Sequence, residues 1–134
     1  MAEPVWLAME AVLGIHQRQL AEHGGSEGTR DPGGLESALA RPRHLFAYGD
    51  PPPDLAALAT AYAGGFVRNH PFVDGNKRVA LVAARTFLRL NGLDLVAAPQ
   101  EKYVAVMALA TREMSEDEFA AWVRSHLESW EPKR

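Results

Sequence analysis

The sequence predicts an all-α protein of five to six helices, folded as a single domain over residues 1–134. Apolar residues recur at helical spacing in several separate stretches of the chain. Proline, glycine and capping residues stand at the borders of these stretches, where helices begin and end. No internal repeat, low-complexity tract or linker divides the chain, and 134 residues suffice for one hydrophobic core.

Glycine and proline interrupt the helical pattern in the first part of the chain. Pro4 opens an apolar pattern that stops at the glycine pair 24–25, and Asp31 is placed to cap a second helix. We expect this second helix to be short and to end near Pro42, because proline disfavours a helix interior. The stretch from 43 to 54 contains three consecutive prolines and predicts an irregular or hairpin-like segment.

Residues 54–69 are small and apolar at helical spacing, which predicts a buried central helix. Gly64 and Gly65 lie inside it, and each costs a helix on the order of 1 kcal/mol relative to alanine, so we expect close backbone packing there. Pro71 ends this helix, and another should run from about Gly75 or Asn76 to Leu90.

Two further helices are expected in the last part of the chain. One should cover residues 99–112, and Ser115 with Glu118 has the capping-box spacing that starts another, to about Ser129. The stretch LDLVA at 93–97 is too short to classify. Trp130 is the one residue of the tail expected to dock on the domain.

Composition and charge exclude several classes of function. The net charge of −3 argues against direct nucleic-acid binding and against an anionic-membrane surface. Without cysteine the chain has no disulfide, thiolate metal site or cysteine nucleophile. The N-terminal stretch lacks both a basic start and a long apolar run, so we expect no signal peptide, no membrane span and a cytoplasmic location.

Residues 70–81, HPFVDGNKRVAL, concentrate polar side chains between two predicted helices. A tight turn there leaves the first backbone N–H groups of the new helix without partners, and the helix dipole favours an anion at that end. Gly75 lets the backbone approach a ligand, while Asn76, Lys77 and Arg78 add an amide donor and two positive charges. A phosphate fits this environment.

His70 and Asp74 add acid–base and metal chemistry to the same turn. Asp74 would repel an anion unless Mg²⁺ bridges it to phosphates, and His70 can accept a proton near neutral pH. Taken singly, each residue has an ordinary explanation, such as a surface histidine or an N-cap aspartate. Together they favour a ligand site, because Lys77 and Arg78 lie at the wrong end of a helix for its dipole.

This stretch resembles the signature of the Fic/Doc family, H-P-F-x-D/E-G-N-G-R-x-x-R, and its H-x-F-x-D-x-N-K-R form resembles the Doc (death-on-curing) toxin branch. Residues 30–43 and 87–92 also resemble Doc-type sequences, so the likeness extends over nearly the whole chain. It implies a compact helical core that binds ATP and Mg²⁺, with a short flap at about 43–53 that docks the backbone of a target.

The resemblance also implies a role for each residue of the turn. His70 would deprotonate a target hydroxyl, Asp74 would hold Mg²⁺, and Asn76, Lys77 and Arg78 would hold phosphates. Doc-type proteins resemble kinases of translation elongation factor Tu that a Phd-type antitoxin holds inactive. The expected function is therefore a toxin that arrests translation and growth.

Two departures from the Fic pattern bear on the reaction. Position 77 is lysine where Fic enzymes have glycine, and Leu81 replaces the second arginine. Both disfavour the pose needed for AMP transfer and favour transfer of the γ-phosphoryl group. The alternatives are a Fic-like nucleotidyltransferase and a catalytically silent module that binds an antitoxin. No [S/T]-x-x-x-E-[G/N] motif is present, so inhibition should come from another chain.

The remaining polar features invite ordinary interpretations. Arg68, two residues before His70, could reach the phosphates or pair with a carboxylate. The stretch GGSEG at 24–28 predicts a flexible loop rather than a phosphate cradle. Four histidines have no ligand spacing and are expected at the surface: His16, His23, His44 and His126.

Overall fold

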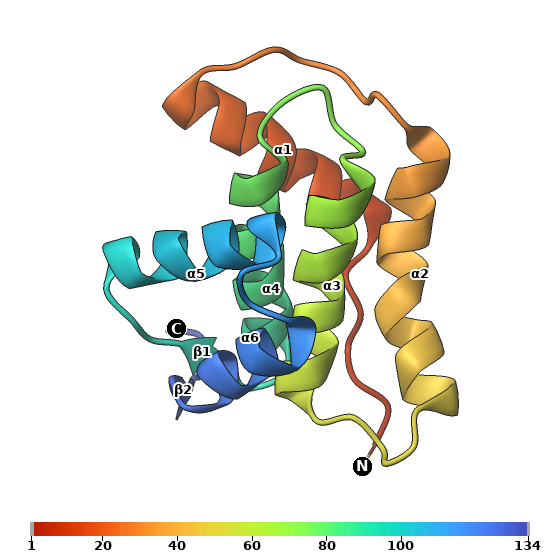
Figure 1. Ribbon diagram of the computed structural model, residues 1–134, viewed down its shortest axis with the longest axis vertical. Helices are drawn as coiled ribbons and strands as arrows, with labels where there is room; N and C mark the ends of the chain where they lie inside the picture. The colour runs from red at the N-terminus through yellow and green to blue at the C-terminus, as the bar shows by residue number, and fades with distance from the viewer. Residues whose placement is uncertain (1, 134) are drawn as a thin grey trace.

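The computed structural model describes residues 2–133, which form six α-helices and one two-stranded antiparallel sheet (Figure 1). The elements are α1 (Met9–His23), α2 (Pro32–Tyr48), α3 (Leu55–Asn69), α4 (Asn76–Leu90), β1 (Leu93–Leu95), α5 (Pro99–Thr111), α6 (Glu116–Arg124) and β2 (Leu127–Ser129). The expected all-α class is confirmed. No helix within residues 2–133 combines the length and the apolarity that crossing a membrane requires.

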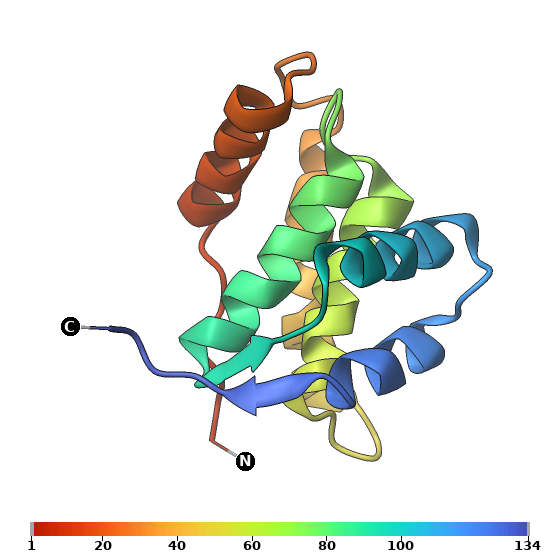
Figure 2. The ribbon, with the colours of Figure 1, turned by 90° about the vertical axis from the view of Figure 1, so that its left-hand side faces the viewer.

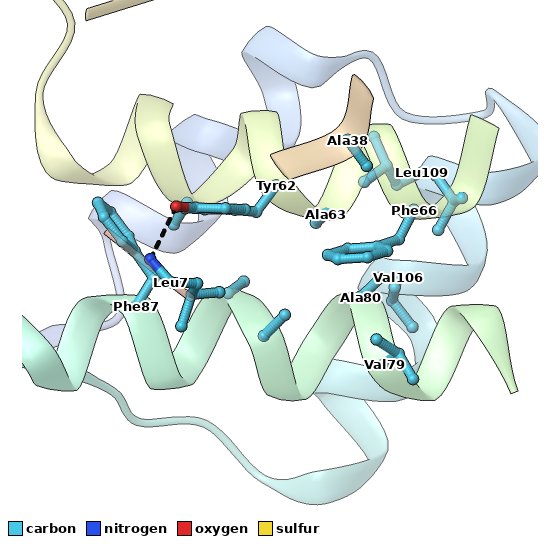
Figure 3. Packing of buried hydrophobic residues seen from close by; sticks show 14 of the residues in the cluster. Leu7, Ala38, Tyr62, Ala63, Phe66, Val79, Ala80, Phe87, Val106 and Leu109 are labelled. Atoms are coloured by element: carbon cyan, nitrogen blue, oxygen red, sulfur yellow. Dashed lines mark hydrogen bonds between the residues drawn. The ribbon is translucent and has the colours of Figure 1, made fainter. Parts of the chain in front are cut away.

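The core is built around α3, which lies between α2 and α4 (Figures 1 and 2). Figure 3 shows Tyr62 and Phe66 of α3 above Phe87 and Val79 of α4, and all four side chains are buried. A Cβ added at Gly65 would lie 3.0 Å from the Cα of Ala38 in α2. The expected close backbone packing is therefore confirmed at Gly65, whereas a Cβ at Gly64 would meet the side chains of Arg41 and Glu116.

Capping residues place the helix starts where local chemistry predicts them. Asp31 Oδ1 accepts a hydrogen bond from the Gly34 N–H at 2.9 Å, and Asp54 Oδ1 accepts one from the Ala57 N–H at 2.9 Å. The capping box at Ser115 is formed in both directions. Each cap satisfies backbone donors that the first helical turn cannot satisfy internally.

The N-terminal segment corrects the expected start of the first helix. Residues 4–8 are extended, and α1 begins only at Met9. The side chain of Asn91 bonds both backbone groups of Val5, at 2.8 and 3.0 Å, and the Leu7 N–H donates to Tyr62 Oη at 3.1 Å (Figure 3). These tertiary contacts replace the intrahelical hydrogen bonds that a helix from Pro4 would have made.

Helix α2 corrects the expected break at Pro42. The helix continues to Tyr48, and Pro42 is buried in its interior, so packing outweighs the intrahelical hydrogen bond that proline cannot make. The remaining loop, 49–54, joins α2 to α3 at the end opposite the turn between α3 and α4 (Figure 1). The 15 residues of α3 separate the two by about 22 Å. The expectation of a target-docking flap at about 43–53 was therefore wrong, because residues 43–48 are helical and the loop that follows lies far from the motif.

The C-terminal segment corrects the expected end of the last helix. Helix α6 stops at Arg124, and Leu127–Ser129 pairs with β1 in the register Leu93↔Ser129. The Trp130 N–H donates to the Gly92 carbonyl at 3.0 Å, and the Arg89 guanidinium lies 4.8 Å from the centre of the Trp130 ring. The expected docking of Trp130 is confirmed.

Candidate functional site

The residues of the HPFVDGNKR motif form the turn between α3 and α4, and left-handed backbone conformations stand at both of its ends. His70 has φ 44° and ψ 57°, and Gly75 has φ 82°. Pro71 and Phe72 are buried and fix the turn on the core, while Asp74 is exposed. A non-glycine residue in this region costs about 1–2 kcal/mol, so neighbouring contacts must hold His70 in place.

The start of α4 presents unpaired backbone donors. Its first intrahelical bond runs from the Val79 N–H to the Gly75 carbonyl, at 3.0 Å. The N–H groups of Asn76, Lys77 and Arg78 have no partner within residues 2–133, and no side chain caps this end. Asp74 is therefore not an N-cap. This arrangement of donors suits an anion.

Lys77 and Arg78 are exposed at this helix start and form no ion pair within the part of the chain that the structure describes. The first turn of α4 contains no acidic residue. Two cations beside three free N–H groups give the turn a positive surface. This is the charge placement expected for a phosphate site.

Asn76 braces the turn from inside. It is only 8% exposed, its Oδ1 accepts from the Phe72 N–H at 3.0 Å, and its Nδ2 donates to the Phe72 carbonyl at 3.0 Å. Both side-chain groups are thus used by the turn itself. Its contribution to an anion site is the backbone N–H, while a side-chain contact with phosphate stays a prediction.

His70 offers an imidazole that is free to react. The residue is exposed, and no side-chain hydrogen bond or ring contact engages it within residues 2–133. Its carbonyl accepts from Arg30 Nε at 2.8 Å, and Arg30 Nη2 donates to the Asn69 carbonyl at 2.8 Å. Arg30 therefore holds the strained backbone and leaves the ring available as a base.

The segment 25–31, which begins within the predicted GGSEG loop, lies against the turn (Figure 1). The Val73 N–H donates to the Gly28 carbonyl at 3.0 Å, and the Ser26 N–H donates to Asp74 Oδ2 at 3.3 Å. A Cβ at Gly25 would lie 2.8 Å from Asp74 Oδ2, so only glycine allows this approach. The structure places this segment, and not 43–53, beside the motif.

His16 was expected at the surface, and this was wrong. The residue lies on α1, is 5% exposed, and its Nε2 lies 2.9 Å from the carbonyl oxygen of Asp74. Its ring stacks on Phe72 with 3.8 Å between ring centres. A cleft of about 720 Å³ opens beside it, lined by Leu20, Gly25 and Gly28 among others. No local spacing links His16 to a turn 58 residues away.

Two residues near the motif turn out to be engaged elsewhere. Arg68 Nε lies 3.4 Å from Glu116 Oε2 on α6, so the carboxylate partner is the alternative that the geometry favours. Leu81 packs on the hydrophobic core and offers no charge to a distant phosphate. Among residues 2–133 no group of three or more histidine, aspartate or glutamate side chains could hold a metal, which leaves Asp74 as a single carboxylate.

Comparisons with known proteins agree with the motif. A family model described as Fic/DOC family matches residues 6–88. The chain is 33% identical over 118 residues to "Protein kinase doc" of Escherichia phage P1, covering 88% of this chain and 92% of that protein. It is 46% identical over 74 residues to "Toxin Doc" of Mycolicibacterium smegmatis, covering 55% of this chain and 57% of that protein. The chain therefore belongs to the Fic/DOC family.

Proposed function

We propose that the protein is a Doc-like toxin that transfers the γ-phosphoryl group of ATP to a hydroxyl side chain of a translation elongation factor. The observation that carries the proposal is the pairing of a free imidazole at His70 with the anion-suited start of α4. The names of the two relatives, a protein kinase and a toxin, support the same conclusion. The resulting arrest of translation would stop growth.

The reaction would use the groups of the turn in sequence. The His70 imidazole would take the proton of the target hydroxyl as its oxygen bonds to the γ-phosphorus and the bond to the β-phosphate oxygen breaks. ADP leaves and the phosphorylated side chain remains. The N–H groups at the start of α4, with Lys77 and Arg78, would stabilise charge on the phosphates.

The carboxylate of Asp74 fits a magnesium ion. Asp74 Oδ1 accepts one N–H from Gly75 and Oδ2 accepts one from Ser26, so each oxygen keeps a lone pair for a cation. Mg²⁺ commonly binds through one or two carboxylates plus substrate phosphates. When bound, it would neutralise charge on the transferred phosphoryl group.

Features of α4 support phosphoryl transfer over nucleotidyl transfer. Lys77 places a long charged side chain where glycine would admit a phosphate closely, and Leu81 packs on the core instead of clamping a far phosphate. A Fic-like AMP transfer stays the second candidate. A silent antitoxin-binding module is disfavoured, because no protein group among residues 2–133 engages the His70 imidazole or the free N–H groups of the first turn of α4.

Both proposed partners can be given a docking surface beside the turn. We infer that the target backbone docks near residues 26–29, which lie against Val73 and Asp74. An antitoxin of the Phd type would insert a helix that blocks this approach, and the cleft beside α1 lies next to the turn. A free toxin of this kind would arrest its own host unless such a partner restrained it.

The test is to follow ATP labelled at the γ- or the α-phosphate with purified elongation factor Tu. Transfer of γ-label with Mg²⁺ supports the proposal, transfer of α-label supports nucleotidyl transfer, and no transfer with a well-folded protein contradicts both. Asp74→Asn should lose Mg²⁺-dependent turnover while its melting temperature stays unchanged. Asp117→Asn, an exposed aspartate on α6, is the matched control.

A further inference from the structure

His16 is the residue outside the motif that lies most directly under the turn. It contacts two residues of the turn: the ring stacks on Phe72, and Nε2 lies 2.9 Å from the Asp74 carbonyl oxygen. The ring also lies close to Gly75, since a Cβ added there would be 3.8 Å from Cδ2. Because a carbonyl oxygen can only accept, Nε2 must carry the hydrogen. The histidine is thus a donor aimed at one peptide group.

That peptide group joins Asp74 to Gly75 and is bonded at both of its ends. Its carbonyl oxygen accepts from His16, and its N–H donates to Asp74 Oδ1 at 2.9 Å. The second bond also sets the direction of the Asp74 carboxylate. A rotation of this peptide would break both bonds and release the carboxylate from its present direction.

We propose that His16 is a positioning residue that locks the Asp74–Gly75 peptide, and through it the carboxylate that faces Mg²⁺ and ATP. This inference rests on the proposed function for its kinetic consequence. Its structural content, a hydrogen bond from a buried imidazole to the turn, stands without it. Gly75 is the hinge concerned, because glycine lacks a Cβ and tolerates both signs of φ, so its φ of 82° can change when the peptide rotates.

Two substitutions separate the donor from the ring. His16→Phe keeps an aromatic ring to stack on Phe72 and removes the donor, whereas His16→Gln removes the ring and places an amide N–H near the position of Nε2. We expect His16→Phe to lower kcat for phosphoryl transfer by roughly 10- to 100-fold, the range typical when a group that orients a ligand is removed. His16→Gln should recover most of that loss, and KM for the target should change less than kcat.

A second measurement does not depend on activity. In ¹⁵N-labelled protein, the amide signal of Gly75 should shift or broaden in His16→Phe and return toward its wild-type position in His16→Gln. Melting temperatures of both variants are recorded, and kinetics are measured below the lower one. His44→Phe, at an exposed histidine of α2, is the matched control and should change neither kcat nor the Gly75 signal.

The outcomes distinguish this inference from the proposed function. If wild type transfers no phosphoryl group but the Gly75 signal responds as described, the function is wrong and the lock stands. A His16→Phe protein with wild-type kcat and an unchanged Gly75 signal would overturn the lock. Equal losses in His16→Phe and His16→Gln would also overturn it, because restoring an N–H donor would then recover no activity.

Discussion

The two ends of helix α4 use the same kind of side chain for opposite purposes. Near the C-terminal end, Arg85 Nε and Arg89 Nε lie 2.8 and 3.0 Å from Asp94 Oδ1, and the Asp94 side chain is only 10% exposed. In the first turn, Lys77 and Arg78 have no acidic partner within residues 2–133. The arginines at the far end hold β1 on the helix, whereas the cations of the first turn remain available to a ligand.

The difference shows what distinguishes a binding site from a structural ion cluster. Both regions are rich in cations, so charge alone does not identify the site. Where a cation has a fixed, buried partner, removing one of the two destabilises the fold, because the other charge is left uncompensated. An unpaired cation at a helix start interacts unfavourably with the positive end of the helix dipole. A bound anion would offset that repulsion, so such a cation indicates a ligand site. Substitutions at the two ends of α4, and the dependence of stability on pH, test this contrast.

The largest effect is expected at the base beside the first turn. His70→Ala should lower phosphoryl transfer about 10²- to 10⁴-fold, the usual loss for a general base. Because the imidazole is exposed and contacts no side chain of the described residues, the melting temperature should stay close to wild type. Activity and thermal unfolding are measured together, with His44→Ala as the control. If cells that express His70→Ala at wild-type abundance stopped growing as they do with wild type, His70 would not be the base.

The unpaired cation should come next. Lys77→Ala should lower kcat/KM for ATP-dependent transfer by roughly 10²-fold, as the loss of one preorganised charge contact does. Stability should hardly change, since no ion pair is lost. Arg18→Ala is the matched control, because that exposed cation already pairs with Glu22 at 3.4 Å. A drop in melting temperature with normal activity would show that Lys77 is structural after all.

The paired cluster should behave in the opposite way. Asp94→Asn should lower the free energy of unfolding by about 2 kcal/mol and the melting temperature by roughly 5–10 °C, because two arginines lose their shared partner. Activity per folded molecule should be unchanged. Differential scanning calorimetry and the transfer assay at a temperature where both proteins are folded give the answer. A folded Asp94→Asn protein without activity would show that the Asp94 cluster serves catalysis as well as stability, which contradicts this distinction between the two ends of α4.

The smallest effect is a dependence of stability on pH. Arg85 and Arg89 hold the pKa of the Asp94 carboxyl well below its usual range. A lowered folded-state pKa means that this stabilisation is complete above the unfolded pKa, about 4, and is lost as the pH falls through the folded value. Urea unfolding at pH 6, 4 and 3 should show a steeper loss for wild type than for Asp94→Asn. If the free energy of unfolding fell equally with pH in both proteins, Asp94 would not be the source of this pH dependence.

Some of this pH dependence should remain in Asp94→Asn. The hydrogen bond and charge of Arg124, together with the Ala57 N–H, lower the pKa of Asp54, which contributes with the same sign. That pair is exposed, so its share is small. Asp54→Asn on the Asp94→Asn background should flatten the curve further.

Helix limits that depend on neighbouring residues could be predicted from the sequence alone. Asp31, Asp54 and Ser115 cap helices through hydrogen bonds to a residue three positions ahead. Pro71 stops α3 independently of how that helix packs in the fold. The motif between α3 and α4 was also evident, because its residue types and spacing lie within nine positions. Local hydrogen bonds and backbone sterics decide such features, and local sequence contains both.

The contacts between the turn and residues distant in sequence could be identified only from the tertiary structure. His16 and the segment 25–31 contact the turn although more than 38 residues of chain separate them from it. The loop 49–54 is nearer in sequence but lies at the opposite end of α3. Pro42 inside α2 and the pairing of β2 with β1 have the same origin. In each case burial and long-range hydrogen bonds outweighed a local preference, and their strength depends on partners that no sequence window contains.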